Sequence, residues 1–283
     1  MELPKNILDK IQKIYSDNPQ GLNIIEEQID LDIQMNYFKR SGMLKKHVFS
    51  FDEILEKLPI LYDPDARLEE KRDELICLAS FDNVEAFRIL EKFKEESEGE
   101  IKLWAAMAYR ESKMLLESSL LDEDQILIST GLGGKGTRLR YFVCLVHRNE
   151  EPYTDVQEKL IREEFESSAE RSESEIESLV FENQYVKVSI VIPINASVKS
   201  VVDPVIEVGE EFGDFIDEHV IITNVRTFTN DEINDIVHDV MSEDDIIDID
   251  ELDAFPIDDY TADLDDDDAD GDVDDDDTDD EDL

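Results

Sequence analysis

The sequence lacks several features on which whole classes of proteins depend. It contains only two cysteines, Cys77 and Cys144, each among apolar neighbours. This excludes a disulfide framework and favours reduced core residues in a cytoplasmic protein. No apolar run reaches the roughly 18 residues of a membrane-spanning helix, and the start at Met1 lacks the basic-then-apolar layout of a secretory signal. We therefore expect a cytoplasmic protein that makes no membrane contact.

Basic residues are scarce. Lys and Arg total 27 against 75 Asp and Glu, a formal net charge of −48. Phosphate contacts need clustered bases, so this balance predicts no direct nucleic-acid binding and no attachment to an anionic membrane. Half of the excess lies in residues 242–283, which hold 24 acidic residues and no basic one. The charge therefore favours a basic protein partner.

Motifs for catalysis are also missing. The four histidines have no short metal-ligand spacing, and the nucleophile, zinc-protease and Cys-x-x-Cys signatures do not occur. His147 and His219 are expected at strand ends, where they could approach one another, but a polar strand end is the favoured interpretation. We predict no catalytic residue and no cofactor.

Helical periodicity dominates the first 120 residues. Residues 1–63 are expected to form short helices, with Ser50 or Asp52 opening one that ends before Pro59. Residues 64–120 carry apolar positions at helical spacing. A helix is predicted to open at Asp63-Pro64, and a third helix from residue 101 contains Trp104.

One part of this region resembles a known repeat family. The Asp-Pro opening with Arg67, the turn at Asp82-Asn83 and the next helix with Phe87 are similar to HEAT-type helix pairs. Together with residues 115–122 and 128–142, they resemble HEAT-like repeat-containing proteins of Bacteroidetes bacteria. The resemblance implies a bacterial cytoplasmic setting and supplies no activity and no site residue.

From residue 121 to 241 the apolar period shortens to two, which is typical of strands. The predicted order is ββαβαβα, a small mixed sheet covered by helices, so the whole chain is expected to be α+β. Residues 167–178 are either the end of a helix or an exposed linker. The expected elements are strands at 125–130, 139–146, 185–194 and 220–225 and helices at 154–169, 203–216 and 229–241.

A glycine-rich segment separates the first two of these strands, which we expect to pair as a hairpin. In one interpretation it is a long flexible turn whose glycines supply positive φ. In the other interpretation, its backbone N–H groups form a nest for an anion, and its basic side chains close on a phosphate, a carboxylate or a partner. The residues concerned are Gly131, Gly133, Gly134, Lys135, Gly136, Arg138 and Arg140.

Residues 242–283 are predicted to be disordered, because an Asp-rich segment cannot offset its ordering entropy by burial. Residues 246–260 keep apolar side chains among the acids, which is typical of segments that order on a partner; we single out Ile247, Leu252, Phe255 and Tyr260. A weak calcium-loop pattern also occurs, at Asp266, Asp268, Asp270 and Asp277. Loose cation association is favoured over a folded site.

A basic cluster lies in the nearly neutral N-terminal half of the sequence, at Lys39-Arg40 and Lys45-Lys46-His47. It is either a solvated helix face or a dock for the acidic tail or an acidic partner. From all this we expect a non-enzymatic cytoplasmic interaction or scaffold protein whose acidic tail engages basic partners. The alternative is a ligand-sensing or phosphoryl-handling α/β domain built on Gly131–Arg140. The oligomeric state stays open.

Overall fold

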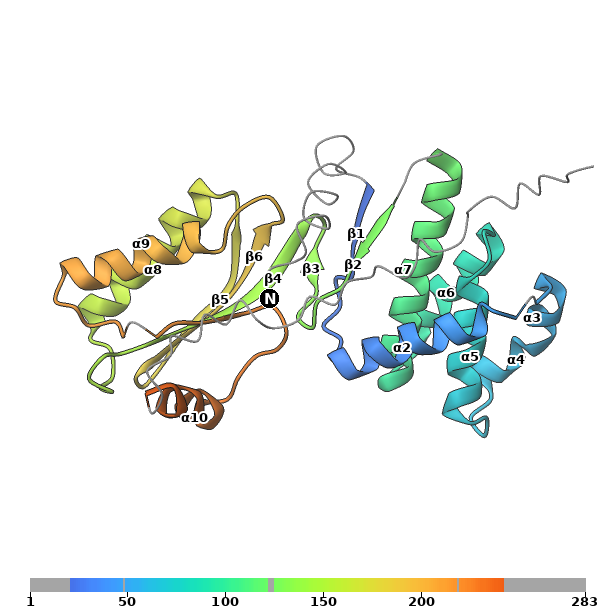
Figure 1. The fold of residues 1–283 in the computed structure, drawn as a ribbon, viewed down its shortest axis with the longest axis horizontal. Helices are drawn as coiled ribbons and strands as arrows, with labels where there is room; N and C mark the ends of the chain where they lie inside the picture. The colour runs from blue at the N-terminus through green and yellow to red at the C-terminus, as the bar shows by residue number, and fades with distance from the viewer. Residues whose placement is uncertain (1–20, 48, 122–124, 218, 242–283) are drawn as a thin grey trace, which may run out of the picture.

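The computed structural model describes residues 21–47, 49–121, 125–217 and 219–241. These residues form two lobes, one made of helices and one built on a sheet (Figure 1). The helical lobe comes first in the chain, which confirms the expected α+β class and its helical N-terminal part. Within the described ranges, no helix has the length and apolar character needed to cross a membrane.

The helical lobe begins and ends its helices at recognisable caps. Asp30, Ser50 and Asn83 each accept backbone N–H groups of the helix that follows. The expected opening at Asp63-Pro64 is wrong: residues 63–67 form a turn, and Arg67 caps the helix with help from Glu70. The helices are α2 (Leu31–Leu44), α3 (Phe51–Lys57), α4 (Pro59–Tyr62), α5 (Leu68–Ala79), α6 (Val84–Glu96) and α7 (Glu100–Leu121).

The core of this lobe gathers around α5 and α7. Trp104 on α7 is 1% exposed and packs against the ring of Tyr37 on α2, with the ring centroids 5.6 Å apart. Ala105 and Ala108 are fully buried, so their small side chains let α7 approach its neighbours closely. The tertiary core thus fixes how α2, α5 and α7 sit together.

The second lobe contains an antiparallel sheet in the order β3-β4-β6-β5, with β7 also paired to β4. The predicted mixed sheet is therefore corrected, because among the residues that the structure describes parallel pairing is confined to β1 (Leu22–Ile24) and β2 (Ile126–Ile128). The strands of the larger sheet are β3 (Gly134–Lys135), β4 (Arg138–Val146), β5 (Glu175–Glu182), β6 (Tyr185–Pro193) and β7 (Ile221–Thr223).

Two differences from the predicted strand order have clear causes. Strand β2 does not form the expected hairpin with β4, because β1 takes it as a partner; β3 and β4 form the hairpin instead. Strand β5 was missed because a register shift between Ile176 and Ser178 interrupts its alternation. Its apolar residues Ile176, Leu179 and Phe181 therefore follow spacings of three and then two.

Helices cover both faces of this sheet (Figure 1). One face packs on α8 (Asp155–Arg171) and α9 (Lys199–Glu211), and part of the other packs on α10 (Asn230–Met241). The predicted opening of α9 at Asp203-Pro204 is wrong, because the helix starts at Lys199 and contains Pro204. Buried Val201, Val202 and Val205 hold that helix against the sheet.

Candidate anion-binding site

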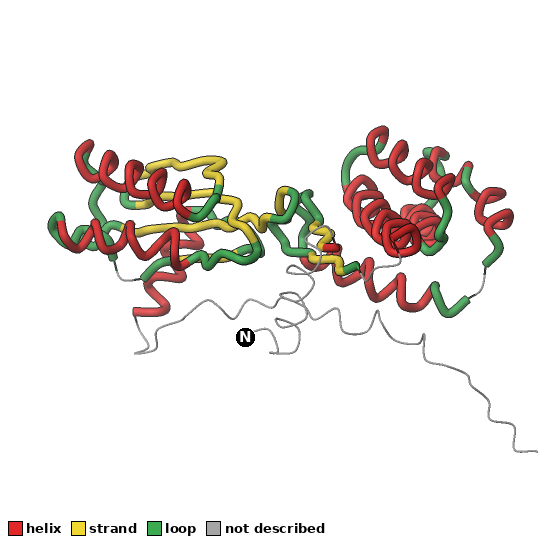
Figure 2. The backbone as a smooth tube through the Cα atoms, turned by 90° about the horizontal axis from the view of Figure 1, so that it is seen from above, coloured by secondary structure: helices red, strands yellow, loops and turns green. Residues whose placement is uncertain are grey.

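The glycine-rich segment forms the seam between the two lobes, which a narrow region of short strands and loops connects (Figure 2). The N–H of Ile29 donates to the Gly131 carbonyl at 3.1 Å, and the N–H of Leu132 donates to the Asn224 carbonyl at 2.9 Å. A Cβ on Gly133 would lie 2.5 Å from the Glu27 carbonyl oxygen. The segment is therefore closely packed, and only Gly136, with φ +62°, serves a hairpin turn.

The bases of this segment are neutralised by glutamates of β5. Lys135 lies 2.7 Å from Glu175, and Arg138 lies 3.7 Å from the same carboxylate. Arg140 binds Glu177 through Nε at 2.5 Å and Nη2 at 2.8 Å, and its Nη1 donates to the Leu132 carbonyl. The hydrogen bond from Arg140 lowers the pKa of Glu177. No free cluster of cations remains here for an anion.

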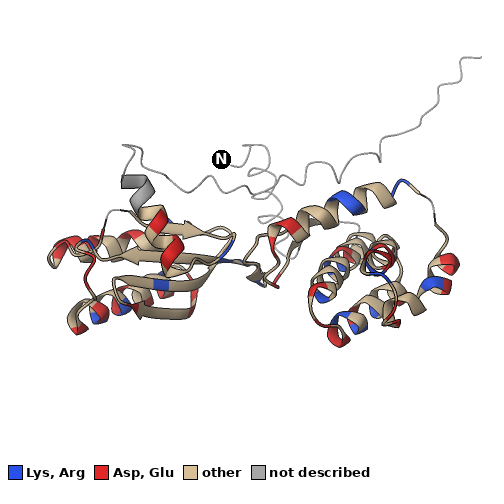
Figure 3. Ribbon diagram, turned by 90° about the horizontal axis from the view of Figure 1, so that it is seen from below, with Lys and Arg blue, Asp and Glu red and all other residues tan. Residues whose placement is uncertain are grey.

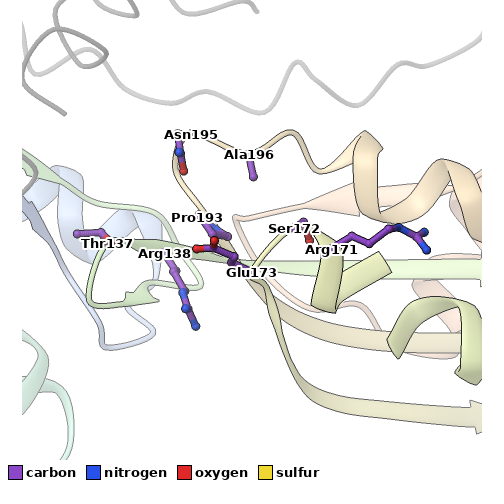
Figure 4. Close-up of a pocket in the computed structure, with 8 residues that line it drawn as sticks. All are labelled: Thr137, Arg138, Arg171, Ser172, Glu173, Pro193, Asn195 and Ala196. Carbon is purple, nitrogen blue, oxygen red and sulfur yellow. The ribbon is translucent and has the colours of Figure 1, made fainter. Parts of the chain in front are cut away.

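A pocket of about 300 Å³ opens at the end of the sheet beside this segment. Its two arginines do not converge: in Figure 4, Arg138 and Arg171 extend in different directions. Arg171 is also held by Glu164, at 2.8 Å. The pocket therefore offers no concentrated charge, and we assign it no ligand. Its lining is Thr137, Arg138, Arg171, Ser172, Glu173, Pro193, Asn195 and Ala196.

The histidines have structural surroundings. His147 is buried, its Nδ1 accepts the N–H of Asn149 at 3.2 Å, and burial lowers its pKa. His219 lies 2.6 Å from Asp217, next to the bridge that joins His147 to Ile216. The two segments therefore meet, as the sequence suggested. Within the described ranges, no group of three or more His, Cys, Asp or Glu residues is placed to hold a metal ion.

The predicted sites of the acidic tail lie outside the described residues. They are the apolar set Ile247, Leu252, Phe255 and Tyr260 and the calcium-loop pattern at Asp266, Asp268, Asp270 and Asp277.

The basic cluster of the sequence leads to a more promising site. Four residues of α2 at positions i, i+3, i+4 and i+7 share one face of that helix. Together with one residue of α5 and one of α7, they enclose a pocket of about 300 Å³. We call it the α2 pocket; its lining is Asn36, Lys39, Arg40, Met43, Arg72 and Trp104.

The three cations of the α2 pocket differ in how they are held. Arg40 forms a two-armed ion pair with Asp73, one arm at 2.9 Å, and this hydrogen bonding raises the pKa of the guanidinium. Arg72 pairs with Glu100 and lies over the Trp104 ring, 4.6 Å from its centroid. The side chain of Lys39 has no ion pair or hydrogen bond with any described residue. Lys39 is thus the free positive charge of the pocket.

Two buried nitrogens of the lining lack acceptors. Trp104 Nε1 and Arg72 Nε are shielded from solvent, and neither has a hydrogen-bond partner. Leaving a buried donor unsatisfied costs about 1–3 kcal/mol. Both atoms are donors only, and so is the ammonium of Lys39. The exposed ammonium of Lys39 is the group of the lining that is open to a ligand, so the pocket matches a ligand that brings acceptor oxygens and negative charge.

Sequence reasoning found part of this site. It singled out Lys39 and Arg40. It did not join Trp104, which is a core residue, or Arg72 to them, because the contacts between α2, α5 and α7 are not visible in local spacing. Lys45, also in the predicted cluster, turns instead to the buried carboxylate of Glu111. The signal available in the sequence was the helical spacing of positions 36, 39, 40 and 43, which places these four residues on one face of α2.

Comparison with known proteins gives few matches. No protein-family model matches the chain, and no curated protein does. Among solved structures, one assigned as a transposase from Deinococcus radiodurans R1 matches at 13% identity and a TM-score of 0.31, over 38% of this chain and 95% of that one. A REP-associated tyrosine transposase bound to a REP hairpin matches at 14% identity and a TM-score of 0.28, over 36% of this chain and 61% of that one.

The descriptions of these two structures stand against two expectations. Neither transposase fits the expected non-enzymatic scaffold with an acidic tail for basic partners, or its alternative, the ligand-sensing loop Gly131–Arg140. The second transposase is bound to a REP hairpin, whereas no direct nucleic-acid binding was expected for this chain.

Proposed function

We propose that this chain binds nucleic acid and that the α2 pocket receives a phosphate group of the strand. The observation that carries the proposal is the group of three cations that line one pocket. Lys39 is exposed and has no ion pair with any described residue, and Arg40 and Arg72 belong to the same lining. A phosphodiester has only acceptors to offer, and lysine and arginine are the usual residues that bind it.

The surroundings of the pocket favour a polymer over a small anion. The basic residues of α2 lie in the second half of the helix, whereas its acidic residue lies in the first turn (Figure 3). Exposed Lys46 extends the basic surface beyond the end of the helix. Met35 and Met43 are 40% and 54% exposed on the same helix, and flexible thioether side chains can pack against the faces of bases. Cations interleaved with exposed apolar side chains suit an unpaired strand.

The large negative charge of the chain does not preclude such a site. Phosphate contacts depend on the local field, which is screened beyond about 8 Å at physiological ionic strength. Binding should still weaken steeply with salt, because each neutralised phosphate releases counterions.

The test is a binding titration with a fluorescent single-stranded oligonucleotide and a DNA hairpin at low salt. Lys39→Glu should weaken binding at least tenfold. Lys159→Glu on α8 changes the charge of the protein equally at an exposed position remote in the chain, and it should leave binding nearly unchanged. Equal affinity of both variants would refute the α2 pocket as the site, and no binding by the parent protein would refute the function.

We also propose that α5, α6 and α7 form a HEAT-like unit that supports the pocket. Each of the three helices contacts the other two. The turn at Asp82-Asn83 that carried the resemblance lies between α5 and α6, where Asn83 caps α6.

A further inference from the structure

We propose that the Asp-rich residues 265–282 of the same chain occupy the α2 pocket when no nucleic acid is bound. The acidic end of the chain would then act as an internal competitor. This inference rests on the proposed function, because it names what regulates that site. Carboxylates resemble phosphodiesters in the respect that matters here, since both offer acceptor oxygens and negative charge and no donor.

Charge complementarity identifies this occupant. Every charged residue in 242–283 is acidic, so no base of the segment itself can pair with its carboxylates. The α2 pocket has the opposite charge: it is lined by three cations, of which Lys39 has no ion pair with any described residue. In contrast, Arg140 and Lys135 on the other lobe are already paired with Glu177 and Glu175. The acidic residues 265–282 should therefore bind more tightly at the α2 pocket than at the glycine-rich segment.

The length of chain permits the contact. Helix α10 ends at Met241, and 23 residues separate it from Asp265. At about 3.4 Å per extended residue this connection reaches up to ~80 Å. Each lobe holds roughly 100 residues, and a compact unit of that size has a radius of gyration of only about 13 Å. Tethering also raises the effective concentration of the segment to the millimolar range, so even weak carboxylate contacts can compete with nucleic acid.

Competition of this kind has a definite consequence for affinity. When a site is open in only a fraction of the molecules, the apparent dissociation constant equals the intrinsic one divided by that fraction, so binding is weaker. Salt weakens the internal contact as well as nucleic-acid binding, because both are electrostatic. The difference in affinity between tails with and without charge should therefore be largest at low ionic strength.

The experiment compares the full-length protein with a full-length variant in which every aspartate of residues 265–282 is replaced by asparagine and Glu281 by glutamine. We call it the charge-neutral variant, because residues 265–282 then carry no charge. The two proteins have equal length, so chain tethering is matched. The charge-neutral variant should bind the single-stranded oligonucleotide at least tenfold more tightly at low salt, and the gap should close near 0.5 M salt. A ratio near one at low salt would overturn the inference.

A second arm does not depend on nucleic acid. Trp104 is the single tryptophan of the chain, so its fluorescence reports on the α2 pocket alone. A synthetic peptide of residues 265–282 should change that emission when added to the charge-neutral variant, and Lys39→Glu in the same background should weaken this response at least tenfold. An asparagine version of the peptide is the control.

The two arms separate the possible failures. If no form of the protein binds oligonucleotide but the peptide titrates Trp104, the tail contact stands and the proposed function fails. If the parent and the charge-neutral variant bind oligonucleotide equally, Lys39→Glu still weakens that binding and the peptide leaves Trp104 unchanged, the proposed function stands and the internal competitor is excluded. A peptide response that is equal in the Lys39→Glu background also overturns the inference, because the contact then lies elsewhere.

Discussion

Gly131 lies directly against the backbone of Val225, so that a Cβ at position 131 would stand 1.8 Å from the Val225 carbonyl oxygen. The two residues belong to segments almost a hundred positions apart, between β2 and β3 and after β7. The same segment accepts the N–H of Ile29 from the helical side. The seam between the lobes therefore depends on the absence of a side chain at this position.

Gly131→Ala should strongly destabilise the protein. The new methyl group cannot be accommodated without moving the Val225 backbone, and such strain belongs to the few mechanisms that cost ~3 kcal/mol or more. Gly136→Ala is the control, since no heavy atom lies within 4 Å of its added Cβ and only its φ of +62° is unfavourable; it should cost about 1 kcal/mol. Thermal melts of the two variants decide the matter. Equal losses would contradict the close packing at Gly131.

Arg140→Ala should destabilise the protein more than Lys135→Ala does. The Arg140 side chain is only 14% exposed, and besides Glu177 it serves the Leu132 carbonyl at 2.7 Å. Its loss leaves these acceptors partly unsatisfied, at a cost of ~2 kcal/mol. Lys135 is 55% exposed, and its pair with Glu175 should be worth less than about 0.5 kcal/mol. Chemical denaturation of both variants measures the two losses of stability. An equal or smaller loss for Arg140→Ala would show that the Arg140 contacts do not stabilise the fold.

Tyr37→Phe should lower stability by about 1–2 kcal/mol. Tyr37 is fully buried on α2, and its hydroxyl donates to the carboxylate of Glu111 on α7. Removing the hydroxyl deprives a buried carboxylate of one donor and leaves it to Lys45 and Ser41. Tyr62→Phe, at a position 49% exposed, serves as the matched control and should change the melting temperature little. An unchanged stability of Tyr37→Phe would show that the Glu111 carboxylate is satisfied without the tyrosine hydroxyl.

Glu74 should make the stability of the protein depend on pH. The side chain lies in the core, its Oε1 has no partner, and burial raises its pKa to about 7 from an ordinary 4.5, opposed only by Lys57. Between these two values the folded state keeps the proton that the unfolded state releases. The contribution of Glu74 to the free energy of unfolding therefore falls as the pH rises from about 4.5 to about 7 and is constant above that.

Glu74→Gln should remove the fall in the free energy of unfolding between pH 4.5 and pH 7, because glutamine does not ionise. The variant should match the parent near pH 4.5 and exceed it at pH 8, by up to ~3 kcal/mol from the size of the shift. Glu69→Gln, an exposed position on the same helix, should show no such divergence. Melting temperatures at pH 5 and pH 8 test the prediction. Parallel pH profiles for parent and Glu74→Gln would mean that Glu74 is ionised in the folded protein.

Much of the local structure followed from short-range signals. Ser50 caps α3 with Glu53 in a reciprocal pair, and Thr154 and Thr229 do the same for α8 and α10 with Gln157 and Glu232. Such interactions span three residues, so the sequence displays them completely. The alternating run of β6 was equally clear, because both its faces lie in a single register with β4.

The errors arose where a distant partner overrides local preference. Strand β2 pairs with β1, a segment about a hundred residues earlier, and this pairing withdraws it from the expected hairpin. Strand β5 contains a register shift that no local pattern reveals. Pro204 was expected at a helix start, but the apolar face of α9 against the sheet carries the helix past it.

For the candidate site, the sequence by itself determined which groups are present: a lysine next to an arginine in one helix, a single tryptophan, and an acidic segment without a basic residue. Only the tertiary structure decided which of them meet. It joined Lys39 of α2 to Arg72 of α5 and Trp104 of α7, and it paired Arg140 with Glu177 of a strand that sequence reasoning had missed. The physical reason is that whether a cation is available to a ligand depends on the carboxylates beside it in space, and those carboxylates come from segments whose positions only the folded core fixes.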